Sequence, residues 1–389
     1  MRILLFTGKG GVGKTSIAAA TALSAARAGV RTLIMSTDPA HSLADSFDRE
    51  VDSEPTSIEE RLWAQQIDSQ QRLEENWKEI QQYAVDVLSW TGMDGIQAEE
   101  LSVIPGLDEL FSLADIKRYH DDSSYDLLVV DCAPTAETLR LLSLPEIMAW
   151  YIEKIFPIER KIVNAVRPVL SRMKSLPPIA NDNVFAAIER FYRRIEGIRE
   201  ILTDAKTSSI RLVVNAEKMV IAEARRTFTY LSLFGYRVDA VIVNRLIPDR
   251  VTDEYFDHWK QIQEEHLVTI EESFSPVPIL KARLFEQEMV GTRLLGQLAE
   301  EVYGTADPTS IMYSDEPFRI TTDNGSTLLW IKLPFAGKGD VDLSRRGDEL
   351  YIKVGNFKRN LVLPMSLKRA EVKGAGFDGD RLRISFEVT

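Results

Sequence analysis

The residues Gly8-Lys9-Gly10-Gly11-Val12-Gly13-Lys14-Thr15-Ser16 directly follow the apolar run 2–7 and open a stretch with helical character. They match G-x-x-x-x-G-K-[ST] in the strand, loop and helix context that this pattern needs to bind phosphate. Glycines allow successive backbone N–H groups to turn inward around phosphate oxygens, and the N-terminal end of the helix attracts negative charge. We expect residues 8–16 to contact ATP, with Lys14 at the β- and γ-phosphates and Thr15 at Mg²⁺.

A second lysine, Lys9, lies inside this loop. One phosphate loop needs only one such lysine. The additional cation is explained if Lys9 reaches a second phosphate group, for instance across a dimer interface. A solvated loop lysine is the alternative interpretation.

Short apolar runs alternate with helical stretches through the first part of the chain. The candidate strands are 2–7, 31–36, 62–67, 126–131, 210–215, 238–244 and 277–280. Continuous runs such as Leu127–Val130 are typical of strands that are buried on both faces of a parallel sheet. The alternation therefore predicts an α/β fold, a doubly wound sheet of the P-loop NTPase type.

Two aspartates follow candidate strands of this sheet. Asp38 comes after the run 31–36, and Asp131 ends the run 126–131. Ligands of such sheets bind outside the carboxyl ends of the strands, so both carboxylates are expected beside the phosphate loop. Asp38 could orient an attacking water, and Asp131 could hold the magnesium shell. We therefore predict that Thr15, Asp38 and Asp131 bind Mg²⁺ directly or through water, and that Asp38, Lys9 and Lys14 are catalytic.

Composition excludes several classes of protein. The chain has 389 residues, 44% hydrophobic and 27% charged, which is ordinary for a soluble globular protein. Its net charge of -12 makes a nucleic acid a poor partner, because phosphate-backbone binding needs a basic surface. One cysteine excludes an intrachain disulfide framework, and the four histidines form no zinc pattern. We expect no signal peptide, no transmembrane span and a cytoplasmic protein.

The last part of the chain changes in pattern. Residues 350–354 and 382–388 alternate apolar with polar side chains, and turn signals occur at Gly347-Asp348 and Asp378-Gly379. We predict an all-β sandwich over 318–389. Turn-rich residues 305–317 are the expected linker, and 1–304 the expected ATPase domain.

Two helical insertions are expected in the first domain, near 70–120 and 146–205. Apolar residues recur at helical spacing in 72–89 and again between Ile155 and Leu202. Such faces commonly pack on the sheet or on each other. The alternative is a groove for an apolar client helix.

Three motifs together resemble the ArsA-type ATPases, the family of the arsenical-pump ATPase and of the ATPase that targets tail-anchored membrane proteins. The motifs are GKGGVGKT from Gly8, STDPAHS around Asp38 and DCAPTAETLR from Asp131. The resemblance covers roughly 1–304. It implies that Lys9 contacts nucleotide across a homodimer, that Asp38 activates water in the first switch and that Asp131 belongs to the second switch. It also places Asn244 at the adenine, Glu217 at the nucleotide near the dimer interface, and Pro278 in the last nucleotide loop.

The chain departs from that family in its second switch. Cys132, Ala136 and Glu137 replace the usual Thr, Gly and His. The single cysteine excludes the inter-subunit zinc clasp of the targeting ATPase, the arsenite thiolates of the pump and an iron–sulfur cluster. The cofactors implied are ATP and Mg²⁺, with no zinc and no iron–sulfur cluster.

The segments 328–334, 341–355, 360–364 and 379–386 are similar to the α-crystallin sandwich of small heat-shock proteins. This domain fused to an ArsA-type ATPase suggests a photosynthesis-associated branch, so the stroma is the alternative location for a plastid protein without its transit peptide.

The combined resemblance implies a homodimeric ATPase. Its nucleotide cycle would open and close a site for a hydrophobic client, such as a membrane-protein segment, with a possible membrane receptor. The alternatives are a nucleotide-gated scaffold that hydrolyses little ATP, a metalloid-pump motor, and a positioning ATPase on DNA or membrane.

Overall fold

The computed structural model describes residues 1–38, 42–67, 107–150, 152, 182–323, 326–368 and 370–387. Within these residues, eight strands form one sheet, and all neighbours are parallel except the edge pair β3 and β4. In spatial order the strands are β3 Thr56–Glu59, β4 Leu62–Gln66, β2 Thr32–Ser36, β5 Leu127–Asp131, β1 Arg2–Thr7, β6 Ser208–Asn215, β7 Val238–Leu246 and β8 Ile279–Arg283. The predicted doubly wound fold is confirmed.

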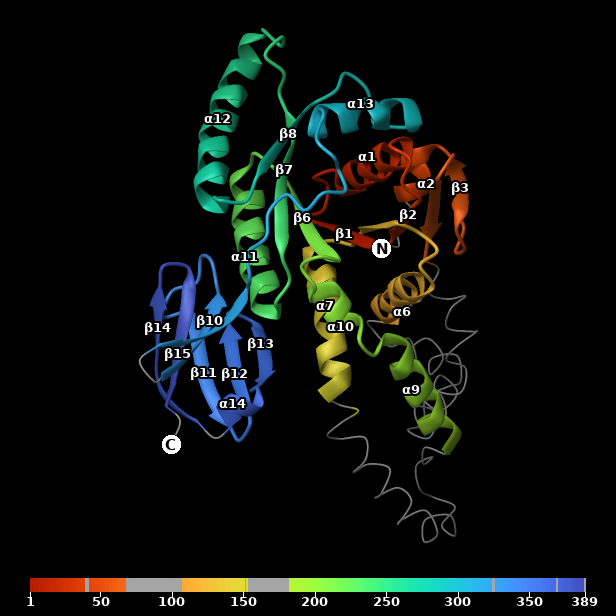
Figure 1. The fold of residues 1–389 in the computed structure, drawn as a ribbon. Helices are drawn as coiled ribbons and strands as arrows, with labels where there is room; N and C mark the ends of the chain where they lie inside the picture. Colours follow the sequence, from red (N-terminus) through yellow and green to blue (C-terminus); the bar gives the residue numbers. More distant parts are fainter. Residues whose placement is uncertain are drawn as a thin grey trace, which may run out of the picture.

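Helices cover both faces of this sheet (Figure 1). One face carries α1 Lys14–Arg27, α2 Ser42–Phe47 and α13 Thr292–Tyr303. The other carries α6 Leu107–Asp122, α7 Thr135–Trp150, α10 Ile198–Thr203 and α11 Lys218–Phe234. α9 Asp182–Ile195 packs on α6, and α12 Glu254–Phe274 projects beside α11 and β8.

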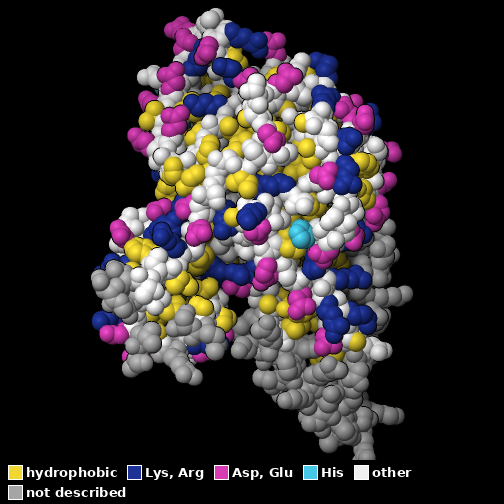
Figure 2. Space-filling view, viewed as in Figure 1, with side chains coloured by type: hydrophobic (Ala, Val, Ile, Leu, Met, Phe, Trp, Pro, Cys, Tyr) yellow, Lys and Arg dark blue, Asp and Glu magenta, His cyan; other side chains and the backbone are white. Residues whose placement is uncertain are grey.

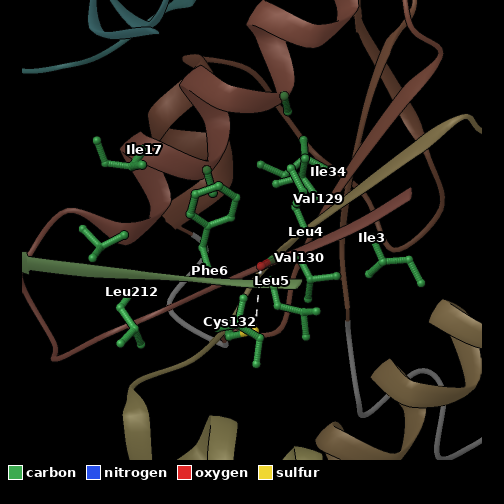
Figure 3. Packing of buried hydrophobic residues seen from close by; sticks show 14 of the residues in the cluster. Ile3, Leu4, Leu5, Phe6, Ile17, Ile34, Val129, Val130, Cys132 and Leu212 are labelled. Carbon is green, nitrogen blue, oxygen red and sulfur yellow. Dashed lines mark hydrogen bonds between the residues drawn. The ribbon is translucent and has the colours of Figure 1, made fainter. Parts of the chain in front are cut away.

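The core lies between the sheet and its helices. The central strands read as continuous apolar runs because both of their faces are covered, and every residue of β5 is buried. Figure 3 shows Phe6 of β1 on the side of the sheet that carries Ile17 of α1, while Val130 of β5 lies with Leu5 on the other side. This packing holds the carboxyl ends of β1, β2 and β5 beside the loop that follows β1.

The short strand β3 was not predicted. It is an antiparallel edge strand in which only Ile58 is buried, so it lacks the apolar run that marks the inner strands. Because β3 comes earlier in the chain, the strand that ends in Asp131 is the fifth in chain order, whereas it is the fourth of the candidate strands. The sheet order nevertheless places β5 directly between β2 and β1.

The C-terminal part is a separate pair of antiparallel sheets, as predicted. One sheet contains β14 Glu371–Asp378, β15 Arg381–Glu387, β10 Ser326–Lys332 and β9 Phe318–Asp323; the other contains β11 Val341–Arg346, β12 Glu349–Val354 and β13 Phe357–Val362. A short helix, α14 Met365–Lys368, precedes β14. Side chains such as Ile331, Ile352 and Ile384 fill the space between the sheets. Gly347 and Gly379 take positive φ at the two predicted turns, which other residues adopt at a cost.

The predicted apolar stripes are described only in part. Residues 72–89 and most of 151–181 lie outside the described residues. In α9 and α10, Phe191, Ile195, Ile198 and Leu202 are buried, and the ring of Phe191 packs edge-on against Phe111 at 5.8 Å. Here the apolar face packs into the core, as expected of most amphipathic helices. None of the described helices has the length and hydropathy of a bilayer span.

On the face that Figure 2 shows, basic and acidic side chains are interspersed.

Candidate nucleotide-binding site

The glycine loop connects the end of β1 to the start of α1 and has no room for side chains at two positions. A Cβ on Gly8 would lie 2.2 Å from the carbonyl oxygen of Val213. Gly13 has a φ of 91°, and a Cβ there would lie 2.4 Å from the side-chain nitrogen of Asn244. The loop therefore needs glycine at both positions, because the neighbouring strands β6 and β7 approach it closely.

The helix that follows the loop begins with open backbone donors. Gly13 occupies the N-cap position of α1, where no side chain caps the first N–H groups. Such an N-terminus attracts anions, because its N–H groups and the helix dipole both favour negative charge. The Lys14 side chain is 7% exposed and its Nζ donates to the carbonyl oxygen of Lys9 at 3.3 Å. Loop and lysine thus form a positively charged cradle.

Asp131 closes the cradle from β5. It pairs in register with Phe6 of β1 and Ser36 of β2, and it is fully buried. Neither carboxylate oxygen has a hydrogen-bond partner of ordinary geometry. Burial raises the pKa of Asp131 to about 7, and the charge of Asp38 adds to this, while Thr15, Lys14 and Ser36 oppose it.

Asp38 follows β2 on the same edge of the sheet. Its backbone N–H donates to the Ser36 hydroxyl at 3.2 Å, and its charge acts on Asp131. The structure thus brings together the loop, Lys14, Thr15, Asp38 and Asp131, as the sequence predicts.

Replacing Asp131 with asparagine should stabilise the protein at high pH. Because the folded pKa of about 7 exceeds the ordinary 3.8, the folded chain holds more protons between these values. The free energy of unfolding of the wild type should therefore fall as pH rises through this window, by roughly 4 kcal/mol in full. Urea unfolding without Mg²⁺ should show Asp131→Asn equal to wild type near pH 4 and more stable at pH 8. The control Asp45→Asn, at an exposed aspartate, should have the stability of the wild type at both pH values. If Asp131→Asn also had wild-type stability at both, the raised pKa of Asp131 would be contradicted.

The segment after Asp131 is tied to the start of the loop. The Thr138 hydroxyl, in the first turn of α7, lies 3.0 Å from the hydroxyl of Thr7 and donates to the carbonyl oxygen of Ala133 at 2.6 Å. The hydroxyl of Thr135 is buried and has no partner. These contacts join the end of β1, where the glycine loop begins, to the first turn of α7.

Asn244 lies against the loop from β7. Its side-chain amide donates to the carbonyl oxygen of Val12 at 2.9 Å and accepts from the backbone N–H of Arg245. Asn215, paired with Asn244 in register, was not predicted as a site residue; its buried side-chain oxygen has no partner. The signal that could have indicated it is its position at the carboxyl end of β6, in VVNA beside IVNR. Glu217 is exposed at the start of α11, two residues further on.

Pro278 is not brought to this site. It lies just before β8, where its carbonyl oxygen accepts from the backbone N–H of Val241. The loop lies at the opposite, carboxyl edge, about 16 Å away along a strand of this length. At that edge the backbone N–H of Leu284 donates to Leu246. The residues after Arg283 are the part of this segment near the loop, so we leave Pro278 out of the candidate site.

The donor set fits a magnesium–nucleotide complex. Hard cations such as Mg²⁺ take oxygen ligands, and the partnerless oxygens of Asp131 beside the Thr15 hydroxyl are of that kind. Lys14 and the N-terminus of α1 supply positive charge for the phosphates.

Comparison with known proteins decides the family. The profile of the anion-transporting ATPase family, ArsA, matches residues 1–304. The chain belongs to this family. A second profile, the HSP20-like domain found in ArsA, matches residues 324–386. This ArsA-family chain is therefore an ATPase with a C-terminal HSP20-like region.

Two relatives align with essentially the whole chain, both regions included, and a third aligns with about three quarters of it. A "Putative arsenical pump-driving ATPase" from Prosthecochloris vibrioformis is 42% identical over 100% of this chain and 96% of its own length. A protein of the same name, numbered 1, from Aquifex aeolicus is 40% identical over 99% of each chain. The ATPase get3 of Aspergillus niger is 27% identical over 77% of this chain and 89% of its own length.

Proposed function

We propose that this ATPase is a Mg²⁺-dependent homodimer whose nucleotide cycle controls the binding of a hydrophobic protein segment. The observation that carries the proposal is the buried, partnerless Asp131 beside Lys14, Thr15 and Asp38. Bound Mg²⁺ would neutralise charge on the β- and γ-phosphates. Lys14 would hold the phosphates, and Asp38 would orient the attacking water.

A second copy of the chain would meet the edge of the sheet that carries the loop. Apolar side chains are exposed there: Met219 in the first turn of α11 is 72% exposed, and Leu284 after β8 is 47% exposed. Lys9 is half-buried in the loop at the same edge. Exposed apolar side chains around a charged site are typical of a protein contact surface. A facing subunit would cover them and receive Lys9.

The client part of the proposal rests on the ArsA resemblance and on a family relative of the get3 type. Coupling requires the client to bind the nucleotide states with different affinities. A peptide with a 20-residue apolar helix should be recovered on the immobilised chain in amounts that differ between Mg·ATP, Mg·ADP and no nucleotide. The same peptide with three central residues replaced by lysine is the control. Equal recovery of the apolar peptide in all three states would contradict the coupling.

Two alternatives are separated by simple measurements. The replaced residues of the second switch favour a scaffold that hydrolyses little ATP. The steady-state rate of ATP hydrolysis distinguishes this alternative. The names of two relatives favour a pump motor. Arsenite binds thiolates, and the single cysteine, Cys132, is buried with its pKa raised by burial. We therefore expect arsenite to leave the turnover of this chain unchanged.

A further inference from the structure

The β sandwich is packed firmly on α11. The rings of Tyr230 and Phe357 lie 4.3 Å apart between centroids, and the Thr229 hydroxyl donates to the carbonyl oxygen of Pro334. Leu233 of α11 belongs to the hydrophobic cluster of the sandwich itself. Figure 1 shows the sandwich beside α11, facing α7. Because the two regions share apolar contacts, the sandwich is held in a defined position.

Arg359 of β13 is a buried charged residue that contacts both α7 and α11. It is 2% exposed; its Nε lies 3.4 Å from Oε1 of Glu146, and its guanidinium donates to the carbonyl oxygen of Leu233. The guanidinium also stacks on the ring of Phe318 at 4.3 Å. Burial lowers the pKa of Arg359 to about 10, Glu146 opposes this and Arg199 adds to it. At neutral pH the guanidinium is charged, so Glu146 is its necessary counter-charge.

Glu146 belongs to α7, the helix that starts at the phosphate site. Thr135 and Thr138 lie in its first turn, and Glu146 lies eleven residues after Thr135, about 16 Å along the axis. The hydroxyl of Tyr236 donates a hydrogen bond to the carbonyl oxygen of Leu142, in the middle of α7, at 2.6 Å. One continuous helix therefore contacts the nucleotide site at one end and the sandwich at the other.

A cavity of about 1200 Å³ lies beside the C-terminal half of α7. It is bounded by Pro145 and Ile147 of α7, Gly197 between α9 and α10, and Tyr351 and Leu361 of the sandwich. Close-packed interiors resist displacement, whereas a helix that borders a cavity has room to shift. This part of α7 therefore has open space on the side that faces the sandwich.

We propose that the Arg359–Glu146 pair couples the β sandwich to the ATPase site through α7. The nucleotide-dependent position of α7 sets how the sandwich is held, and the sandwich in turn biases nucleotide affinity, because coupling between two sites is reciprocal. The inference rests on the proposed function, since it requires Mg·ATP to bind the glycine loop. Arg359 and Glu146 act as positioning residues, far from the phosphates.

The test is a double-mutant cycle on Mg·ATP affinity. Calorimetry should show that Arg359→Met and Glu146→Gln each change the Kd about 3- to 30-fold. The Kd of the double variant should change no more than that of the more affected single variant, because each of the three variants removes the same contact. Arg359→Met removes the buried cation and leaves Glu146, whose side chain is 24% exposed, so we expect this variant to fold even if Glu146→Gln does not. In the wild type, Mg·ATP should also change amide hydrogen exchange in β13, and Arg359→Met should abolish that change.

A control variant breaks contacts between the linker and the sandwich, away from α7. Asp315 pairs with Lys332 at 2.6 Å and with Arg381 at 2.7 Å. Asp315→Asn should lower the melting temperature but leave the Kd for Mg·ATP unchanged; an equal shift in Kd would show general loosening and overturn the proposal. If the wild type binds Mg·ATP normally, an unchanged Kd in Arg359→Met and Glu146→Gln would overturn the coupling but not the proposed function. Additive changes in the double variant would do the same. A wild type that binds no Mg·ATP would overturn the proposed function as well.

Discussion

Asp38→Asn is expected to lower the steady-state rate of ATP hydrolysis by about 100- to 10,000-fold, the range for losing a group that positions or deprotonates the attacking water. Asp38 follows β2 on the edge that carries the loop and acts on Asp131. Asparagine keeps the shape of the side chain but accepts a proton poorly. Binding of Mg·ATP should be retained, because Lys14 and the N-terminus of α1 are untouched.

Asp45→Asn is the matched control for this measurement. Asp45 is an exposed aspartate in α2, close in sequence to Asp38, and it has no role in the proposed mechanism. Its turnover should equal that of the wild type. Equal turnover of wild type and Asp38→Asn would remove Asp38 from the mechanism and favour the scaffold alternative.

Mixing two inactive variants should restore activity if Lys9 acts across the dimer. Lys9→Ala and Asp38→Asn should each be nearly inactive alone. In a mixed dimer, the site of the Lys9→Ala chain has its own Asp38 and receives Lys9 from the Asp38→Asn subunit. Random pairing makes half of the dimers mixed, each with one intact site, so about a quarter of wild-type activity should return.

The complementation has an internal control. A mixture of Lys14→Ala with Asp38→Asn contains one chain without a phosphate lysine and one without the water-positioning aspartate, so no site is intact and no activity should return. If the Lys9→Ala mixture also stays inactive after subunit exchange, Lys9 acts within its own chain and the predicted contact across the dimer is wrong.

Much of the fold could be predicted because its signals are local. Continuous apolar runs identify strands buried on both faces, and the predicted strands 126–131 and 238–244 correspond to β5 and β7. Strand β3 was not predicted, because at the edge of the sheet only its Ile58 is buried and it has no apolar run. The alternating pattern and glycine turns were sufficient for the sandwich, since hairpin register follows from turns and side-chain alternation.

The site could be predicted only where a motif specifies the backbone. The glycine loop, Asp38 and Asp131 come together because each follows a parallel strand at the same edge. Pro278 was misplaced, since similarity of a segment does not tell which end of a strand a residue occupies. Asn215 was missed although it ends a predicted strand, and the lack of a partner for its side-chain oxygen is visible only in three dimensions. The Arg359–Glu146 pair joins residues 213 positions apart, beyond the reach of any sequence period.

Titrating Mg·ATP into the purified chain in a calorimeter tests the central claim most directly, namely that the glycine loop binds a nucleotide. The account predicts saturable heat with one nucleotide per chain, and its loss in Lys14→Ala at unchanged melting temperature. No heat with the wild type, or the same heat with Lys14→Ala, would contradict it.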